Sequence, residues 1–180
     1  MKGVIFNFLA EMVEDGFGLE AWDAILQKTG HSGVYISTDT YEDQELMDLV
    51  AAAHEISGVP VTDLVRSFGE YMFPRFHQAN PQFFSDDMTL KSFLLSVDRI
   101  IHVEVRKLHP GAQLPEFEYK DETDNELTMY YTSPRKLCHV AEGLIAGAAK
   151  HFNTEYTLDH PECMHDGAKA CTLHLTMLEK

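Results

Sequence analysis

Positive charge is scarce in this chain. It carries 14 lysines and arginines against 29 aspartates and glutamates, which gives a formal net charge of −15. An acidic surface repels the phosphates of DNA and RNA and the headgroups of anionic membranes. We therefore expect no nucleic-acid partner and no function at a membrane surface.

Long apolar runs are also lacking. No stretch approaches the roughly 20 apolar residues that a membrane-spanning helix needs. The opening residues MKGVIFNFLAEMVEDG do not resemble a signal peptide, because Glu11, Glu14 and Asp15 interrupt the apolar run and no small-residue cleavage site follows. We therefore predict a cytoplasmic protein with no membrane segment.

Cysteine is rare, and the common catalytic motifs are missing. Three cysteines in a protein expected to be cytosolic argue against a disulfide framework and for metal binding or free thiols. The sequence has no HExxH, no GxSxG and no glycine-rich phosphate-binding loop, which disfavours a metal-dependent hydrolase and other common enzyme classes. We therefore predict that the protein is not an enzyme.

The chain does have clear hydrophobic periodicity. Helical spacing of apolar residues predicts helices over 7–12, 19–28, 40–50, 62–71 and 89–108. Alternation of polar and apolar residues predicts strands over 116–120, 126–131, 154–158 and 171–177. Between the second and third strands, Ser133 as N-cap and Pro134 in the first turn predict a helix that runs to about His151. Helices followed by strands around one helix indicate an α+β fold.

A histidine in the middle of the helix 89–108 is the first candidate functional residue. His102 lies among aliphatic residues, with Asp98 and Arg106 four positions before and after it. An imidazole on a core-facing helix can hold haem iron as an axial ligand. The alternative is a buried histidine satisfied by hydrogen bonds alone. His109 is a competing ligand, but it lies at the helix end.

The segment Tyr131-Thr132-Ser133-Pro134-Arg135 is the second candidate. In an extended segment Tyr131, Ser133 and Arg135 point the same way, and a helix N-terminus beyond them favours anions. Arginine recognises carboxylates with two hydrogen bonds. The segment is thus suited to bind one or two carboxylates, such as the two propionates of haem. Alternatively, Ser133 is only an N-cap, Tyr131 a strand aromatic and Arg135 a solvated side chain.

Cysteine and histidine residues toward the C-terminus form the third candidate. Three thiolates and one imidazole suit a tetrahedral zinc site, whose Zn–S distance is about 2.3 Å. The ligands that we predict are Cys138, His160, Cys163 and Cys171. His139, His165 and His174 remain alternatives for the imidazole. The residues also fit unconnected, reduced cysteines beside surface histidines.

Together these residues resemble the H-NOX family, the haem nitric oxide/oxygen binding domains of bacteria and of soluble guanylate cyclase. The resemblance rests on the MKG start, on His102 in its long helix, on Pro115 and on the motif Y-x-S-x-R at Tyr131, Ser133 and Arg135. It extends over the whole chain, 1–180, as a single domain. It implies a helical N-terminal subdomain, about 1–62, packed on a subdomain of antiparallel sheet plus helices, about 63–180, with haem between them.

The resemblance also implies roles for individual residues. His102 corresponds to the proximal ligand of haem b, and the Tyr131, Ser133 and Arg135 motif corresponds to the propionate clamp. Ile5 and Pro115 correspond to residues that press on the porphyrin and distort it. Some members carry a Cys/His zinc site like the one predicted here, and its thiolates would be oxidisable.

One departure from the family bears on ligand choice. Members that bind oxygen stably carry a tyrosine five positions beyond the arginine, where this chain has Val140, with Ala141 and Leu144 nearby. The pocket therefore resembles that of the NO-selective bacterial branch. We expect binding of nitric oxide, possible binding of CO, and weak or no binding of O₂.

The function that follows is gas sensing coupled to a partner protein. NO bound to ferrous haem would strain or break the bond to His102, relax the porphyrin, and change the affinity of a partner surface. In the family the partner is a sensor histidine kinase or a cyclic-di-GMP enzyme, either a diguanylate cyclase or a phosphodiesterase. The alternative function is a zinc/thiol redox-responsive binding module without haem.

Overall fold

The computed structural model describes residues 1–108, 111–121 and 123–178. Its helices are α1 Gly3–Phe17, α2 Leu19–Thr29, α3 Asp43–Ser57, α4 Val61–Ala79, α5 Leu90–Ser96, α6 His102–Leu108 and α7 Cys138–His151. Its strands are β1 Glu116–Lys120, β2 Glu126–Thr132, β3 Tyr156–Glu162 and β4 Cys171–Met177. They form one antiparallel sheet in the order β1-β2-β4-β3. The predicted α+β fold is confirmed.

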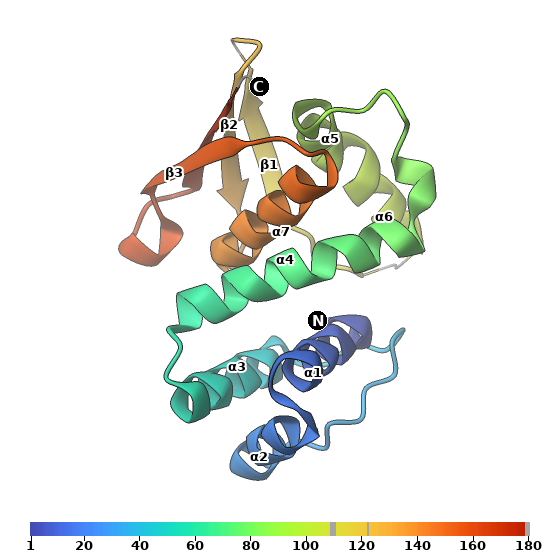
Figure 1. Ribbon diagram of the computed structural model, residues 1–180, viewed down its shortest axis with the longest axis vertical. Helices are drawn as coiled ribbons and strands as arrows, with labels where there is room; N and C mark the ends of the chain where they lie inside the picture. The colour runs from blue at the N-terminus through green and yellow to red at the C-terminus, as the bar shows by residue number, and fades with distance from the viewer. Residues whose placement is uncertain (109–110, 122, 179–180) are drawn as a thin grey trace.

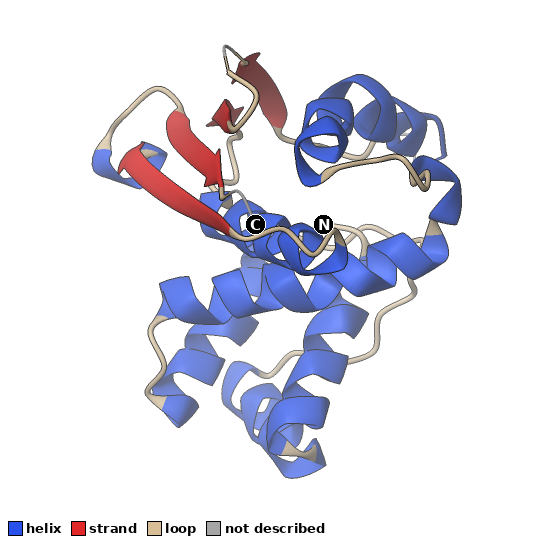
Figure 2. Cartoon of the chain, turned by 45° about the horizontal axis from the view of Figure 1, so that its top comes forward, coloured by secondary structure: helices blue, strands red, loops and turns tan. Residues whose placement is uncertain are grey.

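The elements stack around helix α4. Figure 1 shows α1, α2 and α3 on one side of α4, and α7 on its other side, between α4 and the sheet. Figure 2 shows the strands gathered at one end of the molecule, with helices making up the opposite end. The buried side chains form two clusters, one among α1–α4 and one around α7 and the sheet, and α4 contributes to both. The subdomain boundary near residue 62 stays a prediction.

Helices α4 and α7 cross at unusually short range because glycines line the crossing. A Cβ atom added at Gly143 would lie 1.9 Å from the carbonyl oxygen of Arg66 on α4. One added at Gly69 would lie 2.2 Å from the carbonyl oxygen of Val140 on α7. Backbone atoms have little freedom to retreat in a packed interior, so any side chain at these positions pushes the two helices apart.

We expect Gly143→Ala to lower the free energy of unfolding by about 1–3 kcal/mol or more, because it overpacks this crossing. Gly16→Ala on α1 is the matched control, since a Cβ atom there meets nothing within 4 Å. Removing a helical glycine at an open position stabilises by about 0.5–1 kcal/mol. Urea denaturation of the two variants measures both changes. Equal stability of the two variants would contradict the close packing.

Two predicted helices differ from the structure. The helix over 89–108 is not uniform, because a π-helical turn, Val97–Ile101, separates α5 from α6. The helix predicted from Ser133 was wrong at its start: α7 begins at Cys138, with Leu137 as N-cap. Residues from Ser133 form a turn instead, in which Lys136 has a left-handed φ of 51°, a conformation that no helix continues through. Proline suits the second position of such a turn as well as a helix start.

The other elements lie close to the predicted ranges. The strands at 116–120 and 171–177 have the predicted bounds, and β2 extends one residue further than predicted. Helices α1 and α4 extend beyond the predicted ranges and include further buried residues such as Phe6 and Phe73. Helix α3 begins and ends later than predicted, at 43–57 instead of 40–50, and β3 covers 156–162 instead of 154–158. In the described part of the chain, no helix is both long enough and apolar enough to cross a membrane.

Candidate functional site

His102 is buried where the π-helical turn joins α6. The side chain is 11% exposed, and its Nδ1 atom lies 3.2 Å from Oδ1 of Asp98. The widened turn ends at His102, whose amide donates to the carbonyl of Val97. Such turns often mark functional positions in helices. The imidazole also lies near the ring of Phe117, with 5.9 Å between ring centroids.

The surroundings of His102 act on its pKa in opposite directions, and burial outweighs the others. Burial lowers the pKa of His102 below its ordinary value, while hydrogen bonds with Asp98 and with the backbone at Pro115 act in the opposite direction. A neutral imidazole has one protonated nitrogen and one lone pair, and only the lone pair binds a metal. Asp98 accepts a hydrogen bond from Nδ1, so Nε2 is the nitrogen that remains to bind a metal. His109, the competing candidate, lies outside the described residues.

The predicted Tyr131, Ser133 and Arg135 motif lies at the end of β2 and in the turn after it. The Tyr131 hydroxyl is buried and accepts from the amide of Leu137 at 2.9 Å. The Ser133 hydroxyl accepts from the amide of Arg135 at 3.2 Å. Phe117 contacts the Tyr131 ring at 5.6 Å between centroids, as well as the His102 ring. The aromatic contact through Phe117 thus joins the histidine to the motif.

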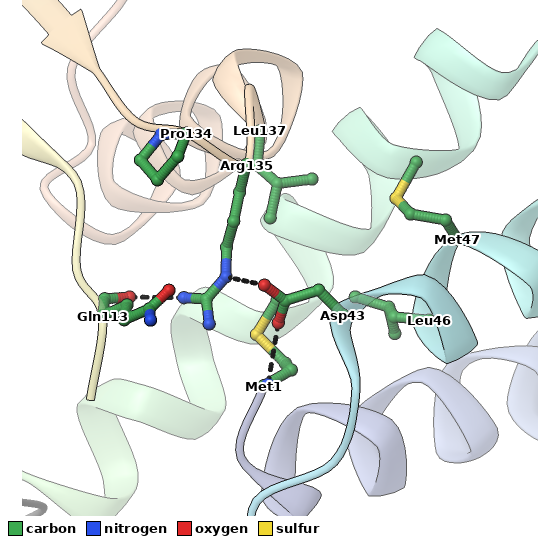
Figure 3. A pocket seen from close by; sticks show the side chains of 8 residues that line it. All are labelled: Met1, Asp43, Leu46, Met47, Gln113, Pro134, Arg135 and Leu137. Carbon is green, nitrogen blue, oxygen red and sulfur yellow. Dashed lines mark hydrogen bonds and ion pairs between the residues drawn. The ribbon is translucent and has the colours of Figure 1, made fainter. Parts of the chain in front are cut away.

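Arg135 borders a pocket of about 210 Å³ between distant segments of the chain. Its Nε atom donates to Oδ2 of Asp43 at 2.5 Å, and its Nη1 atom donates to the carbonyl of Gln113 (Figure 3). Asp43 also binds the N-terminal amine of Met1 at 2.8 Å. Other lining residues are Leu46, Met47, Pro134 and Leu137. Arg135 therefore binds a carboxylate in this structure, as its chemistry predicts.

Asp43 is a residue of this site that the sequence did not point to. Burial opposes its ionisation, but hydrogen bonds from Arg135 and the N-terminal amine outweigh burial and lower the pKa of Asp43. It is 92 residues from Arg135 in sequence. In the sequence, Asp43 stands out only as an acidic residue in the first turn of a predicted helix. Acidic residues are common there because they interact favourably with the helix dipole.

The remaining predicted haem contacts are apolar and half-buried. Ile5 on α1 and Val140 on α7 pack against the cluster formed by α1–α4, and Leu144 packs against both buried clusters. Pro115 is also half-buried, directly before β1. Ile5, Val140 and Leu144 therefore share one apolar neighbourhood, although α1 and α7 are far apart in sequence.

The predicted zinc ligands come together. The ligand atoms of Cys138, His160, Cys163 and Cys171 all lie within 4.8 Å of one another. The Sγ atom of Cys163 lies 3.7 Å from that of Cys138 and 3.9 Å from that of Cys171. A tetrahedral zinc with Zn–S bonds of about 2.3 Å separates its sulfur ligands by roughly 3.8 Å. The two sulfur distances therefore fit a tetrahedral metal ion.

His160 fits the fourth position better than its rivals. Its Nδ1 atom binds Oε1 of Glu142 at 2.6 Å, while its Nε2 atom is buried without a hydrogen-bond partner among the described residues. His165 binds the carbonyl of Lys136, and His174 binds the hydroxyl of Thr128. Buried polar atoms in proteins nearly always have partners, so an unpaired Nε2 beside three sulfurs is typical of a metal ligand. His139 lies nearby and can form a different group with Cys138 and His165.

In the absence of a metal ion, electrostatics at the cysteines opposes the formation of thiolates. Burial raises the pKa of Cys138 and that of Cys171, and interactions among the three sulfurs add to this rise at Cys138. A bound metal ion reverses this balance, because it stabilises thiolates by direct coordination. The backbone amide of Met164 already donates to Sγ of Cys171 at 3.2 Å.

Comparisons with known proteins agree with these features. The family model described as haem-NO-binding matches residues 2–160. The H-NOX protein of Shewanella oneidensis in its Fe(II)NO state has a TM-score of 0.93 and 33% identity, over 99% of this chain and 100% of that one. The unliganded Fe(II) H-NOX protein of K. algicida has a TM-score of 0.89 and 33% identity, over 100% and 98%.

A longer relative matches only in part. Soluble guanylate cyclase gcy-31 of Caenorhabditis elegans is 25% identical over 176 residues, which is 92% of this chain and 24% of the cyclase. The chain therefore spans about a quarter of that relative.

The fold and the matches define the class as a sensor domain rather than an enzyme. Within that class, the chain belongs to the haem-NO-binding family, H-NOX, whose members bind haem and sense gases.

Proposed function

We propose that the protein is a sensor of nitric oxide that holds haem b through His102. The observation that carries this proposal is the buried imidazole of His102, whose Nδ1 binds Asp98 and whose Nε2 remains to bind a metal. Ferrous haem, when bound, supplies the iron that takes up NO. The protein's part is to position the imidazole, bind the propionates and keep the pocket dry.

The haem propionates are proposed to be bound by Tyr131, Ser133 and Arg135. A propionate has the carboxylate chemistry that Arg135 already recognises in Asp43. The three residues lie in a short segment that Phe117 links to His102. This arrangement supports binding of a ligand that carries carboxylates at one edge and a metal at its centre.

Selectivity for NO over O₂ is proposed to follow from apolar side chains on α1 and α7. Ile5, Val140 and Leu144 offer no hydrogen-bond donor, and a donor to bound O₂ is worth about 1–3 kcal/mol, roughly tenfold or more in affinity. NO depends less on such a donor. We therefore propose that NO binds tightly, that CO binds, and that O₂ binds weakly. Ile5 and Pro115 are the residues proposed to distort the porphyrin.

The Cys/His group is proposed to bind zinc. Three sulfurs at tetrahedral spacing and the unpaired Nε2 of His160 support a structural site in which no position is left open for a substrate. This site joins the start of α7 to the β3–β4 connection, and so secures elements that carry the propionate-binding turn.

Signalling is proposed to run through a partner protein. The family is linked to signalling proteins such as guanylate cyclase. For this chain we propose a sensor histidine kinase or a diguanylate cyclase or phosphodiesterase as the partner, with a cytoplasmic location.

Absorption spectra of the reduced, haem-loaded protein test the proposal. We expect the Soret band to shift when NO is added, and to change little under air. The control is the same titration with Val140→Phe, which keeps the pocket apolar. A stable oxygen complex in the wild-type protein would contradict NO selectivity, and failure to take up haem would contradict the proposed function as a whole.

A further inference from the structure

Glu142 is a buried carboxylate that none of the roles above uses. It lies on α7, and only 4% of the residue is exposed. Three different side chains surround it: His160 contacts Oε1, while His139 and Arg66 contact Oε2. Burying a carboxylate is costly unless it is paired, so the three partners of Glu142 indicate that this carboxylate has a specific role. We infer that Glu142 is the positioning residue of the Cys/His metal site, an inference that rests on the proposed zinc binding.

The hydrogen bond from His160 to Glu142 determines which nitrogen of the imidazole is free to bind a metal. Oε1 of Glu142 lies 2.6 Å from Nδ1, which leaves the lone pair on Nε2. That second nitrogen is buried without a hydrogen-bond partner among the described residues, and it belongs to the group that includes three sulfurs. Metal-binding histidines commonly donate their other nitrogen to a carboxylate, which fixes the tautomer and makes the ligand more basic. Glu142 thus acts on the metal through His160.

Arg66 offsets part of the negative charge around the site. A divalent ion with three thiolates carries a net charge of −1, and Glu142 adds a second negative charge. Arg66 on α4 donates to Oε2 of Glu142 from Nε at 2.8 Å and approaches it with Nη2 at 2.7 Å. Its guanidinium, which also pairs with Asp63, therefore offsets part of this negative charge. The pairing also anchors the site to α4, the helix that contributes to both buried clusters.

The test is a measurement of zinc affinity by competition with a chromophoric chelator, on the haem-loaded protein. We expect Glu142→Gln to weaken zinc binding by about 10- to 100-fold, because the neutral amide is a poorer acceptor for the Nδ1 proton. We expect Arg66→Gln to weaken it less, since the carboxylate remains. Glu70→Gln is the control: Glu70 pairs with Lys150 between the same two helices, outside the metal site. The haem absorption bands should be unchanged in all three variants.

A double-mutant cycle with His160→Ala separates positioning from a general loss of stability. If Glu142 acts through His160, removing the carboxylate from the His160→Ala protein should cost little further zinc affinity. If the losses of zinc affinity in the two single variants add in full in the double variant, the inference is overturned. It is also overturned if Glu142→Gln binds zinc as tightly as the wild type. Absence of zinc binding by the wild-type protein would instead refute the proposed metal site itself, whereas the haem spectra test the sensor function separately. Should Glu142→Gln not fold, the cycle of Arg66→Gln with His160→Ala gives the same discrimination.

Discussion

Replacing His102 with glycine is expected to remove the response of the protein to nitric oxide. The imidazole is buried, and no other described histidine shares its position beside Phe117 and the Tyr131 motif. Without it, apparent haem affinity should fall by more than about tenfold, or about 1.4 kcal/mol. The substitution leaves a space of the size of the missing imidazole ring, so free imidazole added to the protein should restore the ferrous spectrum. Absorption titrations of the reduced protein with haem and with NO measure both effects.

His54→Gly is the control for the cost of placing glycine in a helix, which is about 1 kcal/mol. His54 is a half-buried histidine of α3 whose Nδ1 atom contacts the carbonyl of Val59 at 2.7 Å. That variant should lose some stability but keep the haem spectrum and the NO response. If His102→Gly keeps an unaltered ferrous spectrum without imidazole, the assignment of the ligand is wrong.

Val140→Tyr is expected to create affinity for oxygen. Val140 lies in the first turn of α7, half-buried against the same cluster as Ile5 and Leu144. Its backbone is held firmly, since Gly69 of α4 packs directly on its carbonyl. A phenol at this position adds a donor among apolar side chains, worth about 1–3 kcal/mol, so oxygen affinity should rise roughly tenfold or more. Absorption spectra of the reduced protein under increasing oxygen pressure measure the change.

Val140→Phe separates the hydroxyl from its bulk. The phenylalanine variant should bind oxygen as poorly as the wild-type protein, while NO binding persists in both variants. Equal oxygen affinity of the Tyr and Phe variants would show that position 140 does not face the gas-binding side of the haem.

Hydrophobic periodicity was sufficient to predict most of the fold. Alternation in 116–120 and 171–177 reflects strands with one buried face, and the structure confirms those bounds. The π-helical turn at Val97–Ile101 was not predictable, because one extra residue per turn hardly changes a helical apolar pattern. The helix start at Ser133 was wrong because Ser-Pro begins turns as well as helices, and only the left-handed backbone of Lys136 distinguishes them.

The site was predictable where its residues are close in sequence. The motif at 131–135 and the three cysteines stood out by residue type and spacing alone. The pairing of Arg135 with Asp43 and that of Arg66 with Glu142 span 92 and 76 residues, so they depend on how the helices pack. The choice of His160 among four histidines likewise required the contacts of each ring, since residue spacing alone does not reveal which nitrogen lacks a partner.

Resonance Raman spectroscopy of the reduced, unliganded protein is the most direct test of the bond on which the sensor proposal depends. An iron–histidine stretching band that shifts on substitution with ⁵⁴Fe should be present in the wild-type protein. It should be absent from His102→Gly until imidazole is added, and retained in His54→Gly. An isotope-sensitive band of the same frequency in His102→Gly without imidazole would contradict the assignment of His102 as the iron ligand.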